Sequence, residues 1–204
     1  MSIFYNDFYE KKRGKSHGDF SFKWPILKKN VPIKNGQKVL DFGCGTGIII
    51  NKLNKLFSNC KFTGVDVSET AIKIAKKKNP LTKFWVVEDG NKFPFKSFSF
   101  DTILAADVIE HVYNTESTVL EMARVLKKGG KIMITTPYYG FVKNLLIVTF
   151  GFDLILDPTG PHIRFFTKKS LSNLLKKSGL KIIKFGYFGR FYPVSRSMYV
   201  IAQK

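Results

Sequence analysis

The sequence is poor in cysteine and contains no long apolar run. Its two cysteines, Cys44 and Cys60, cannot crosslink a chain of 204 residues, so we expect a reducing, cytoplasmic setting. The uncharged apolar stretch at residues 144–152 has only nine residues, whereas a helix needs about 20 to span a bilayer. Residues 1–7 lack the basic flank and apolar core of a signal peptide. We therefore expect neither a transmembrane helix nor a secretory leader.

Acidic residues are scarce, and arginine is rare among the basic ones. The chain has 34 Lys and Arg residues against 15 Asp and Glu residues, a net charge of +19. Residues 41–121 are balanced, while residues 158–204 contain ten basic residues and no acidic one. Such an excess can indicate a nucleic-acid or anionic-membrane partner. Only five of the basic residues are arginine, whose guanidinium group forms bidentate hydrogen bonds with phosphates and bases. We therefore favour a solvated lysine-rich surface over nucleic-acid binding.

Short apolar runs alternate with helical patterns through the middle of the chain. The pattern predicts strands at residues 38–42, 61–66, 83–88, 100–105 and 131–136, and helices at residues 46–57, 68–79 and 115–126. Strands that alternate with helices form a parallel sheet with helices on both faces. Since 44% of the 204 residues are apolar, we expect one compact α/β domain.

The two ends of the chain are less regular than the middle. In residues 1–35 we expect one or two helices that form a lid, with a break at Trp24-Pro25. Residues 138–166 form an aromatic, glycine-containing insertion on the substrate side. Residues 167–204 predict a closing helix at 167–178 and strands at 180–188 and 197–203. Residues 36–137 remain as the regular core of the domain.

One loop carries the strongest functional signal. It reads Val39-Leu40-Asp41-Phe42-Gly43-Cys44-Gly45-Thr46-Gly47 and lies between a predicted strand and a predicted helix. Glycine lets the backbone approach a ligand closely, and the amides at a helix start face that ligand. Asp66 follows 19 residues after Gly47, at the spacing where an acid binds the ribose of an adenosine cofactor.

Two cofactors compete for such a loop. A dinucleotide site has the pattern Gly-x-Gly-x-x-Gly and places a pyrophosphate at the helix start, whereas this loop has Gly-x-Gly-x-Gly. Asp41 lies two residues before the first glycine, where a carboxylate would repel a pyrophosphate. The same carboxylate suits the ammonium and sulfonium groups of S-adenosylmethionine. A nicotinamide oxidoreductase is therefore the less favoured interpretation.

Five ordered motifs resemble those of the class I S-adenosylmethionine-dependent methyltransferases. They are the glycine loop, Gly64-Val65-Asp66, Glu88-Asp89-Gly90, Phe100-Asp101 and Val125-Leu126-Lys127-Lys128-Gly129-Gly130. Within that superfamily, Ile109-Glu110-His111-Val112 is similar to the type 11 and ubiquinone-biosynthesis O-methyltransferases. The resemblance implies a Rossmann-like three-layer sandwich with a seven-stranded, mostly parallel sheet whose last strand is antiparallel. It also implies S-adenosylmethionine as cofactor and S-adenosylhomocysteine as product.

The resemblance further implies roles for single residues. It places cofactor contacts at Asp41, Gly43, Gly45, Asp66, Asp89 with Gly90 beside it, and Asp107. Cys44 would fill the loop as a small side chain rather than act as a nucleophile. Val67 would pack on the adenine face, or only in the core.

Transfer to a hydroxyl acceptor needs a base, and His111 is the first candidate. It follows the fourth strand at the sheet edge that holds the glycine loop, and a histidine pKa suits the task. Its alternative role is to order that loop. His162 is the second candidate and His17 the third. Glu110 with His111 could hold a divalent metal, but two neighbours cannot make a site alone, so we expect no metal.

The expected acceptor is a small molecule, such as a quinone precursor, a glycan or a lipid-linked intermediate. Aromatic and basic residues of the N-terminal segment and the insertion would bind it. Residues 141–156 also resemble the membrane-touching insertion of the ubiquinone-type enzymes, so peripheral contact with an anionic membrane and a buried lid helix are both open. A methyltransferase acting on RNA or protein and a cofactor-binding scaffold without catalysis are the alternative functions. No oligomeric state is predicted.

Overall fold

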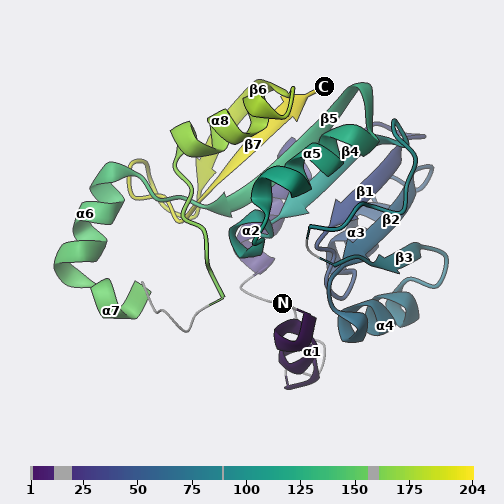
Figure 1. Cartoon of the computed structure of the whole chain (residues 1–204), viewed down its shortest axis with the longest axis horizontal. Helices are drawn as coiled ribbons and strands as arrows, with labels where there is room; N and C mark the ends of the chain where they lie inside the picture. Colours follow the sequence, from purple (N-terminus) through teal and green to yellow (C-terminus); the bar gives the residue numbers. More distant parts are fainter. Residues whose placement is uncertain (1, 12–19, 89, 156–160) are drawn as a thin grey trace.

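The computed structural model describes residues 2–11, 20–88, 90–155 and 161–204 (Figure 1). Within these residues, seven strands form one sheet in the order β3-β2-β1-β4-β5-β7-β6. β1 is parallel to β2 and β4, β2 to β3, and β4 to β5, whereas β7 is antiparallel to β5 and β6. The predicted Rossmann-like sheet with an antiparallel last strand is confirmed. The strands are β1 (Lys38–Phe42), β2 (Lys61–Asp66), β3 (Lys83–Val86), β4 (Phe100–Ala106), β5 (Leu126–Pro137), β6 (Lys181–Phe188) and β7 (Ser197–Gln203).

Helices cover both faces of the sheet, as predicted. α2, α3 and α4 contribute Leu27, Leu53 and Ile72 to the core on one face. α5 and α8 contribute Met122 and Leu171 to the core on the other face. Each of these five helices buries its apolar side chains against the sheet, which produces the three layers. The helices are α1 (Ser2–Lys11), α2 (Phe20–Asn30), α3 (Ile48–Asn54), α4 (Glu69–Lys78), the 3-10 turn η1 (Ile109–His111), α5 (Thr115–Val125), α6 (Phe141–Phe150), α7 (Phe152–Ile155) and α8 (Lys168–Lys177).

Some boundaries differ from the sequence predictions. α3 begins at Ile48 instead of residue 46, because the preceding Gly47 has a left-handed φ of +73°. β5 begins at Leu126 instead of Lys131, since Leu126 pairs with Phe100 before a register shift. The break predicted at Trp24-Pro25 is wrong because Pro25 lies inside α2. Burial of α2 side chains against the sheet offsets the hydrogen bond that a proline cannot make.

The carboxyl ends of the parallel strands share one sheet edge. β1, β2 and β4 end there at Phe42, Asp66 and Ala106. α1 packs on α4 near this edge, and α6 and α7 project beyond the end of β5 (Figure 1). Ile147 is the buried residue of α6, and most of its other apolar side chains are exposed, which favours the surface-contact alternative over a buried lid helix. In the described parts of the chain, no helix combines the length and apolarity that crossing a membrane requires.

Candidate active site

The glycine loop turns directly from β1 across the end of β2. The amides of Gly43 and Cys44 both donate to the Val65 carbonyl, at 2.8 and 3.0 Å. Gly43 has a left-handed φ of +69°, and a Cβ there would lie 2.3 Å from Val108 Cγ2. Gly45 is also left-handed, and a Cβ there would lie 2.7 Å from the Tyr9 hydroxyl. The loop therefore needs glycine at both positions because the backbone is left-handed and packed closely.

Two side chains are buried beneath this loop. Asp41 is 1% exposed, and neither of its carboxylate oxygens has a hydrogen-bond partner among the described residues. Burial raises the pKa of Asp41 to about 8, with a further contribution from the negative charge of Asp66. Cys44 is buried as well, and burial raises the pKa of its thiol well above its usual range. Its expected role as an inert filler agrees with that environment.

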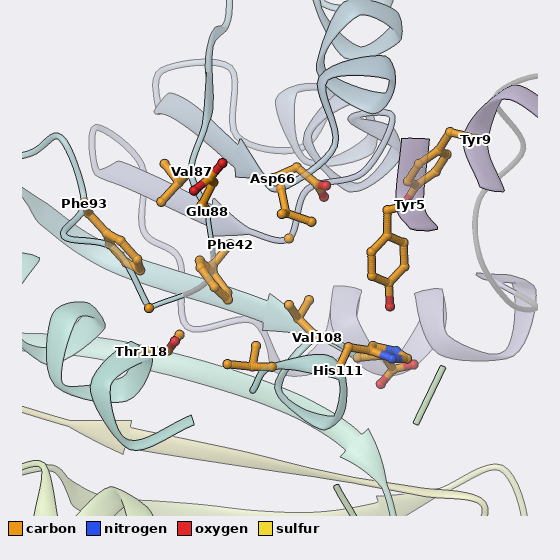
Figure 2. Close-up of a pocket in the computed structure, with 15 residues that line it drawn as sticks. Tyr5, Tyr9, Phe42, Asp66, Val87, Glu88, Phe93, Val108, His111 and Thr118 are labelled. Atoms are coloured by element: carbon orange, nitrogen blue, oxygen red, sulfur yellow. The ribbon is translucent and has the colours of Figure 1, made fainter. Parts of the chain in front are cut away.

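Asp66 ends β2 at the wall of a pocket. Its two carboxylate oxygens accept hydrogen bonds from the amides of Gly45, at 2.8 Å, and Ser68, at 2.9 Å. Burial raises the pKa of Asp66, and these amides oppose the increase. Asp66 therefore binds the amide of Ser68, the residue that precedes α4, and its side chain also faces the pocket (Figure 2).

This first pocket is mainly apolar, and the space inside it, its open mouth included, amounts to about 740 Å³. Phe42 stacks on Phe93 at one end, with ring centroids 5.4 Å apart. Val67, Val87 and other residues from the ends of β1, β2 and β3 line its wall (Figure 2).

α1 closes the opposite side of the first pocket. Tyr5 and Tyr9 line it, and the Tyr5 side chain points toward His111 (Figure 2). Asn6 fastens α1 to the start of α4, because its Oδ1 accepts from the Ser68 hydroxyl at 2.7 Å and the Thr70 amide at 3.2 Å. Burial raises the pKa of both tyrosines, as does the negative charge of Asp66. α1 therefore lies against this pocket, and its role as a lid stays a prediction.

Asp107 follows β4 in a left-handed conformation, with φ of +54°. Its amide donates to Thr135 O, and its Oδ1 accepts from the Thr135 hydroxyl at 2.6 Å. Its Oδ2 forms an ion pair with Lys23 of α2. The carboxylate is therefore held by Thr135 of β5 and Lys23 of α2, and Asp107 lines both pockets of the site.

The two candidate histidines come together although 50 residues separate them. Their ring centroids are 4.9 Å apart. His111 Nδ1 lies 2.8 Å from the Pro161 carbonyl. Glu110, beside them, is completely buried, and neither carboxylate oxygen has a partner among the described residues. Burial raises the pKa of Glu110 to about 7, and the charge of Lys23 opposes that increase.

A second, more polar pocket adjoins the first. Tyr9, Gly43, Asp107 and His111 line both pockets, so His111 lies at their junction, while His162 lines the second pocket alone. The other wall of the second pocket is basic, with Lys143, Arg190 and Arg196 among its residues.

The structure brings most of the predicted site residues to these two pockets. Gly43, Asp66, Val67, Gly90, Asp107 and His111 line the first, and Gly43, Cys44, Gly45, Asp107, His111 and His162 line the second. Asp41 lines neither and lies behind the loop. Asp89 and His17 lie outside the described residues.

Sequence reasoning missed three contributors to the site. Tyr5 and Glu88 line the first pocket, and Lys23 lines the second. Glu88 could have been predicted, because it follows the end of β3 at Val86 and directly precedes Asp89, which was expected to contact the cofactor. Nothing local to Lys23 distinguishes it from the other lysines.

Sequence comparison gives a consistent result. A family profile described as a methyltransferase domain matches residues 40–134. The chain is 31% identical over 166 residues to a ubiquinone biosynthesis O-methyltransferase of Pelagibacter ubique, covering 78% of this chain and 67% of that protein. It is 28% identical over 162 residues to the enzyme of that name from Nitrosospira multiformis, covering 72% of this chain. The chain thus spans only 64% of the length of the Nitrosospira protein.

Structural comparison supports the same fold. A methyltransferase solved in complex with the Haloferax volcanii Trm112 methyltransferase activator matches with a TM-score of 0.80 and 15% identity, over 99% of this chain and 96% of that one. A SAM-dependent methyltransferase of Methanosarcina mazei matches with a TM-score of 0.68 and 22% identity, over 88% of this chain and 97% of that one.

Proposed function

Because the chain belongs to the class I S-adenosylmethionine-dependent methyltransferases, we propose that it methylates a hydroxyl group of a small-molecule acceptor. S-adenosylmethionine is the cofactor of this family. The observation that carries the proposal is the pair of adjoining pockets with His111 and Asp107 at their junction. One pocket would hold the cofactor and the other the acceptor, so that the two meet beside an imidazole.

The residues of the first pocket fit this cofactor. Asp66 accepts one amide on each carboxylate oxygen, and each oxygen keeps a lone pair for a ribose hydroxyl. Val67 and Val87 offer an apolar wall for an adenine ring. Asp41, behind the glycine loop and outside both pockets, has no hydrogen-bond partner among the described residues, so its carboxyl would favour a nearby cation once it is ionised. Asp89 beside Gly90 stays a predicted contact to the adenine amine.

The chain's own groups position the acceptor and handle its proton. When bound, S-adenosylmethionine supplies a methyl group on a sulfonium; the acceptor oxygen bonds to that carbon while the carbon–sulfur electron pair stays on sulfur. Only the ring N–H of His111 Nδ1 can donate to the Pro161 carbonyl, so Nε2 of the neutral ring has the lone pair for the acceptor proton. Burial and the charge of Lys23 lower the pKa of His162, which favours a second neutral imidazole nearby.

The acceptor class follows from the second pocket. Lys143 is half-buried, and its ammonium donates to the Tyr138 carbonyl at 2.7 Å. Burial, together with the charges of Arg190 and Arg196, lowers the pKa of Lys143 to about 8. Three neighbouring cations would be stabilised by an anion, so we propose an acceptor with a carboxylate or phosphate group and a hydroxyl to be methylated. Residues 138–166 would then be the substrate-side insertion and residues 36–137 the cofactor core.

We also propose that α6 touches an anionic membrane surface. Phe141 and Phe150 are each 82% exposed, and Leu145 and Val148 are exposed between them. Residues 158–204, which contain no acid, supply basic flanks. Co-sedimentation with vesicles containing anionic lipid is the measurement. Leu145→Glu should reduce binding and Leu81→Glu, an exposed site away from α6, should not.

The methyltransferase proposal is tested by following labelled methyl transfer from S-adenosylmethionine to hydroxybenzoates, catechols and phosphorylated phenols. His111→Gln should depress turnover while S-adenosylhomocysteine affinity stays unchanged. Tyr113→Phe is the matched control because Tyr113 is exposed, lies two residues away and lines neither pocket. No turnover on any hydroxyl acceptor, with cofactor binding intact, would favour a non-catalytic scaffold. Transfer to RNA or protein alone would favour the alternative function.

A further inference from the structure

Lys23 of α2 forms an ion pair where the two pockets adjoin. Its ammonium pairs with Oδ2 of Asp107, and the two side chains are only 18% and 15% exposed. Lys23 lines the second pocket alone, whereas Asp107 lines both. The pair is therefore largely shielded from water, so a charge that arrives on one side of it acts on the other side with little screening.

The aspartate of this pair is fixed, and the lysine is adaptable. The Asp107 amide donates to the Thr135 carbonyl at 3.0 Å, and Oδ1 of Asp107 accepts from the Thr135 hydroxyl at 2.6 Å. β5 thus holds both the backbone and the side chain of Asp107. Lys23 carries its charge on a flexible four-carbon chain with three rotatable donors. An exchange of partners would therefore move the ammonium and leave the carboxylate in place.

A second cation lies beside Lys23. The ring centroid of Phe22, the preceding residue, lies 5.5 Å from the Lys23 ammonium and 4.8 Å from the guanidinium carbon of Arg196. All three residues line the second pocket. Asp107 neutralises one of these two cations. Once that pairing is exchanged, the pocket wall presents two positive charges around one ring, an arrangement that suits a carboxylate or a phosphate.

Glu110 is the other carboxyl group that interacts with Lys23. It lines the second pocket and is completely buried, and its oxygens have no hydrogen-bond partner among the described residues. Burial raises the pKa of Glu110 to about 7, and the charge of Lys23 opposes that increase. Near neutral pH such a carboxyl is ionised only in part, so it neutralises Lys23 less completely than a fully ionised carboxylate does.

We propose that Lys23 couples the two pockets by changing partners. Asp107 also lines the first pocket, so its carboxylate can pair with the ammonium group of S-adenosylmethionine. Two ammonium groups beside one carboxylate repel each other. Lys23 then leaves Asp107 and, together with Arg196, binds the anionic group of the acceptor in the second pocket. This inference rests on the proposed function and deepens it, because it makes Lys23 a specificity-determining residue for an anionic acceptor.

The exchange makes the two ligands bind cooperatively. Lys23 is available to the acceptor once Asp107 has a new cation, so acceptor affinity rises when the cofactor is bound. By thermodynamic linkage the anionic acceptor raises cofactor affinity by the same factor. Without an acceptor, Lys23 competes with the cofactor ammonium for Asp107, so removal of the lysine charge should tighten cofactor binding.

Calorimetry on the purified chain tests the exchange. The probes are 4-hydroxybenzoate, an anion with a hydroxyl group, and S-adenosylhomocysteine, which retains the cofactor ammonium. We expect S-adenosylhomocysteine to tighten 4-hydroxybenzoate binding at least about fivefold, the lower end of typical couplings. Two matched ligands should show no such gain. They are 5′-methylthioadenosine, which has the adenosine part without the ammonium, and 4-hydroxybenzamide, which is neutral.

Variants of Lys23 assign the coupling to this side chain. Lys23→Gln should abolish it and should bind S-adenosylhomocysteine more tightly than the wild type, whereas a purely structural role predicts weaker binding. Lys23→Arg keeps the charge and should keep the coupling. Lys28→Gln, which changes an exposed lysine on the same helix, is the matched control and should behave as wild type. Glu110→Gln should also keep the coupling, because the acceptor and not Glu110 is the new partner.

S-adenosylhomocysteine binding alone distinguishes this inference from the proposed function. Intact binding without any gain in 4-hydroxybenzoate affinity would overturn the exchange and leave the methyltransferase function standing. Coupling that survives in Lys23→Gln or is lost in Glu110→Gln would overturn the exchange too, as would weaker S-adenosylhomocysteine binding in Lys23→Gln. A wild-type chain that binds no S-adenosylhomocysteine would instead count against the proposed function, on which the exchange depends.

Discussion

Asp41 should make the stability of the free chain depend on pH. Its carboxyl is 1% exposed without a partner, and its folded-state pKa is about 8. In the unfolded chain an aspartate has a pKa of about 3.9. Between these two values the native protein holds a proton that the unfolded chain has released. Raising the pH therefore favours unfolding, and this contribution decreases by as much as about 1.4 kcal/mol per pH unit.

The substitution Asp41→Asn isolates this effect, because asparagine does not titrate. From pH 5 to pH 7 the free energy of unfolding of the wild type should fall by roughly 2–3 kcal/mol relative to that of the variant. Urea titrations at several pH values give both quantities, provided that the slope with urea is the same in the two proteins. Adding S-adenosylhomocysteine should stabilise the wild type more at the higher pH if its ammonium compensates the ionised carboxylate.

The matched control is Asp101→Asn. Asp101 lies at the opposite sheet edge, where its carboxylate accepts from the Lys38 amide and pairs with Lys127. It is ionised in both folded and unfolded chains between pH 5 and pH 7, so this control should show no such slope. A difference between wild type and Asp41→Asn that stays constant across this range would refute the reasoning. The native carboxyl would then have a counter-charge or water that stabilises its ionised form.

Three further predictions test the cofactor pocket, the histidine pair and the core. Asp66→Ala should weaken S-adenosylhomocysteine binding by more than about 1 kcal/mol in calorimetry, the scale of a lost hydrogen bond to a charged group, and unchanged affinity would contradict the placement of the ribose. Arg196→Gln should raise the KM for an anionic acceptor and leave that for its neutral analogue unchanged; equal effects on both would contradict the anion subsite. Leu171→Ala, at a fully buried position of α8, should lower the free energy of unfolding by about 2–5 kcal/mol in urea, and a loss below 1 kcal/mol would contradict its place in the core.

The sequence alone determined the alternation of strands and helices, and with it the layers and the expected cofactor edge, whereas the seven-stranded topology was implied by the family resemblance. Alternating apolar periods of strand and helix type are local properties, and parallel strands must place their carboxyl ends together. The glycine loop and Asp66 could therefore be assigned to one edge before any contact was known. The start of β5 at Leu126 could not be predicted from the sequence, because it depends on pairing with Phe100 across a register shift, which is not a local property.

Only the tertiary structure decided which distant groups meet at that edge. His162 lies against His111 because main-chain hydrogen bonds clamp its segment to Glu110. Lys23 reaches Asp107 because α2 packs on the sheet despite its internal proline. Sequence periodicity predicts which face of an element is apolar, but it does not predict the path of a connecting segment. The residues on the expected acceptor side come from separate segments without a recognisable motif, so only the paths of those segments decide which side chains meet there.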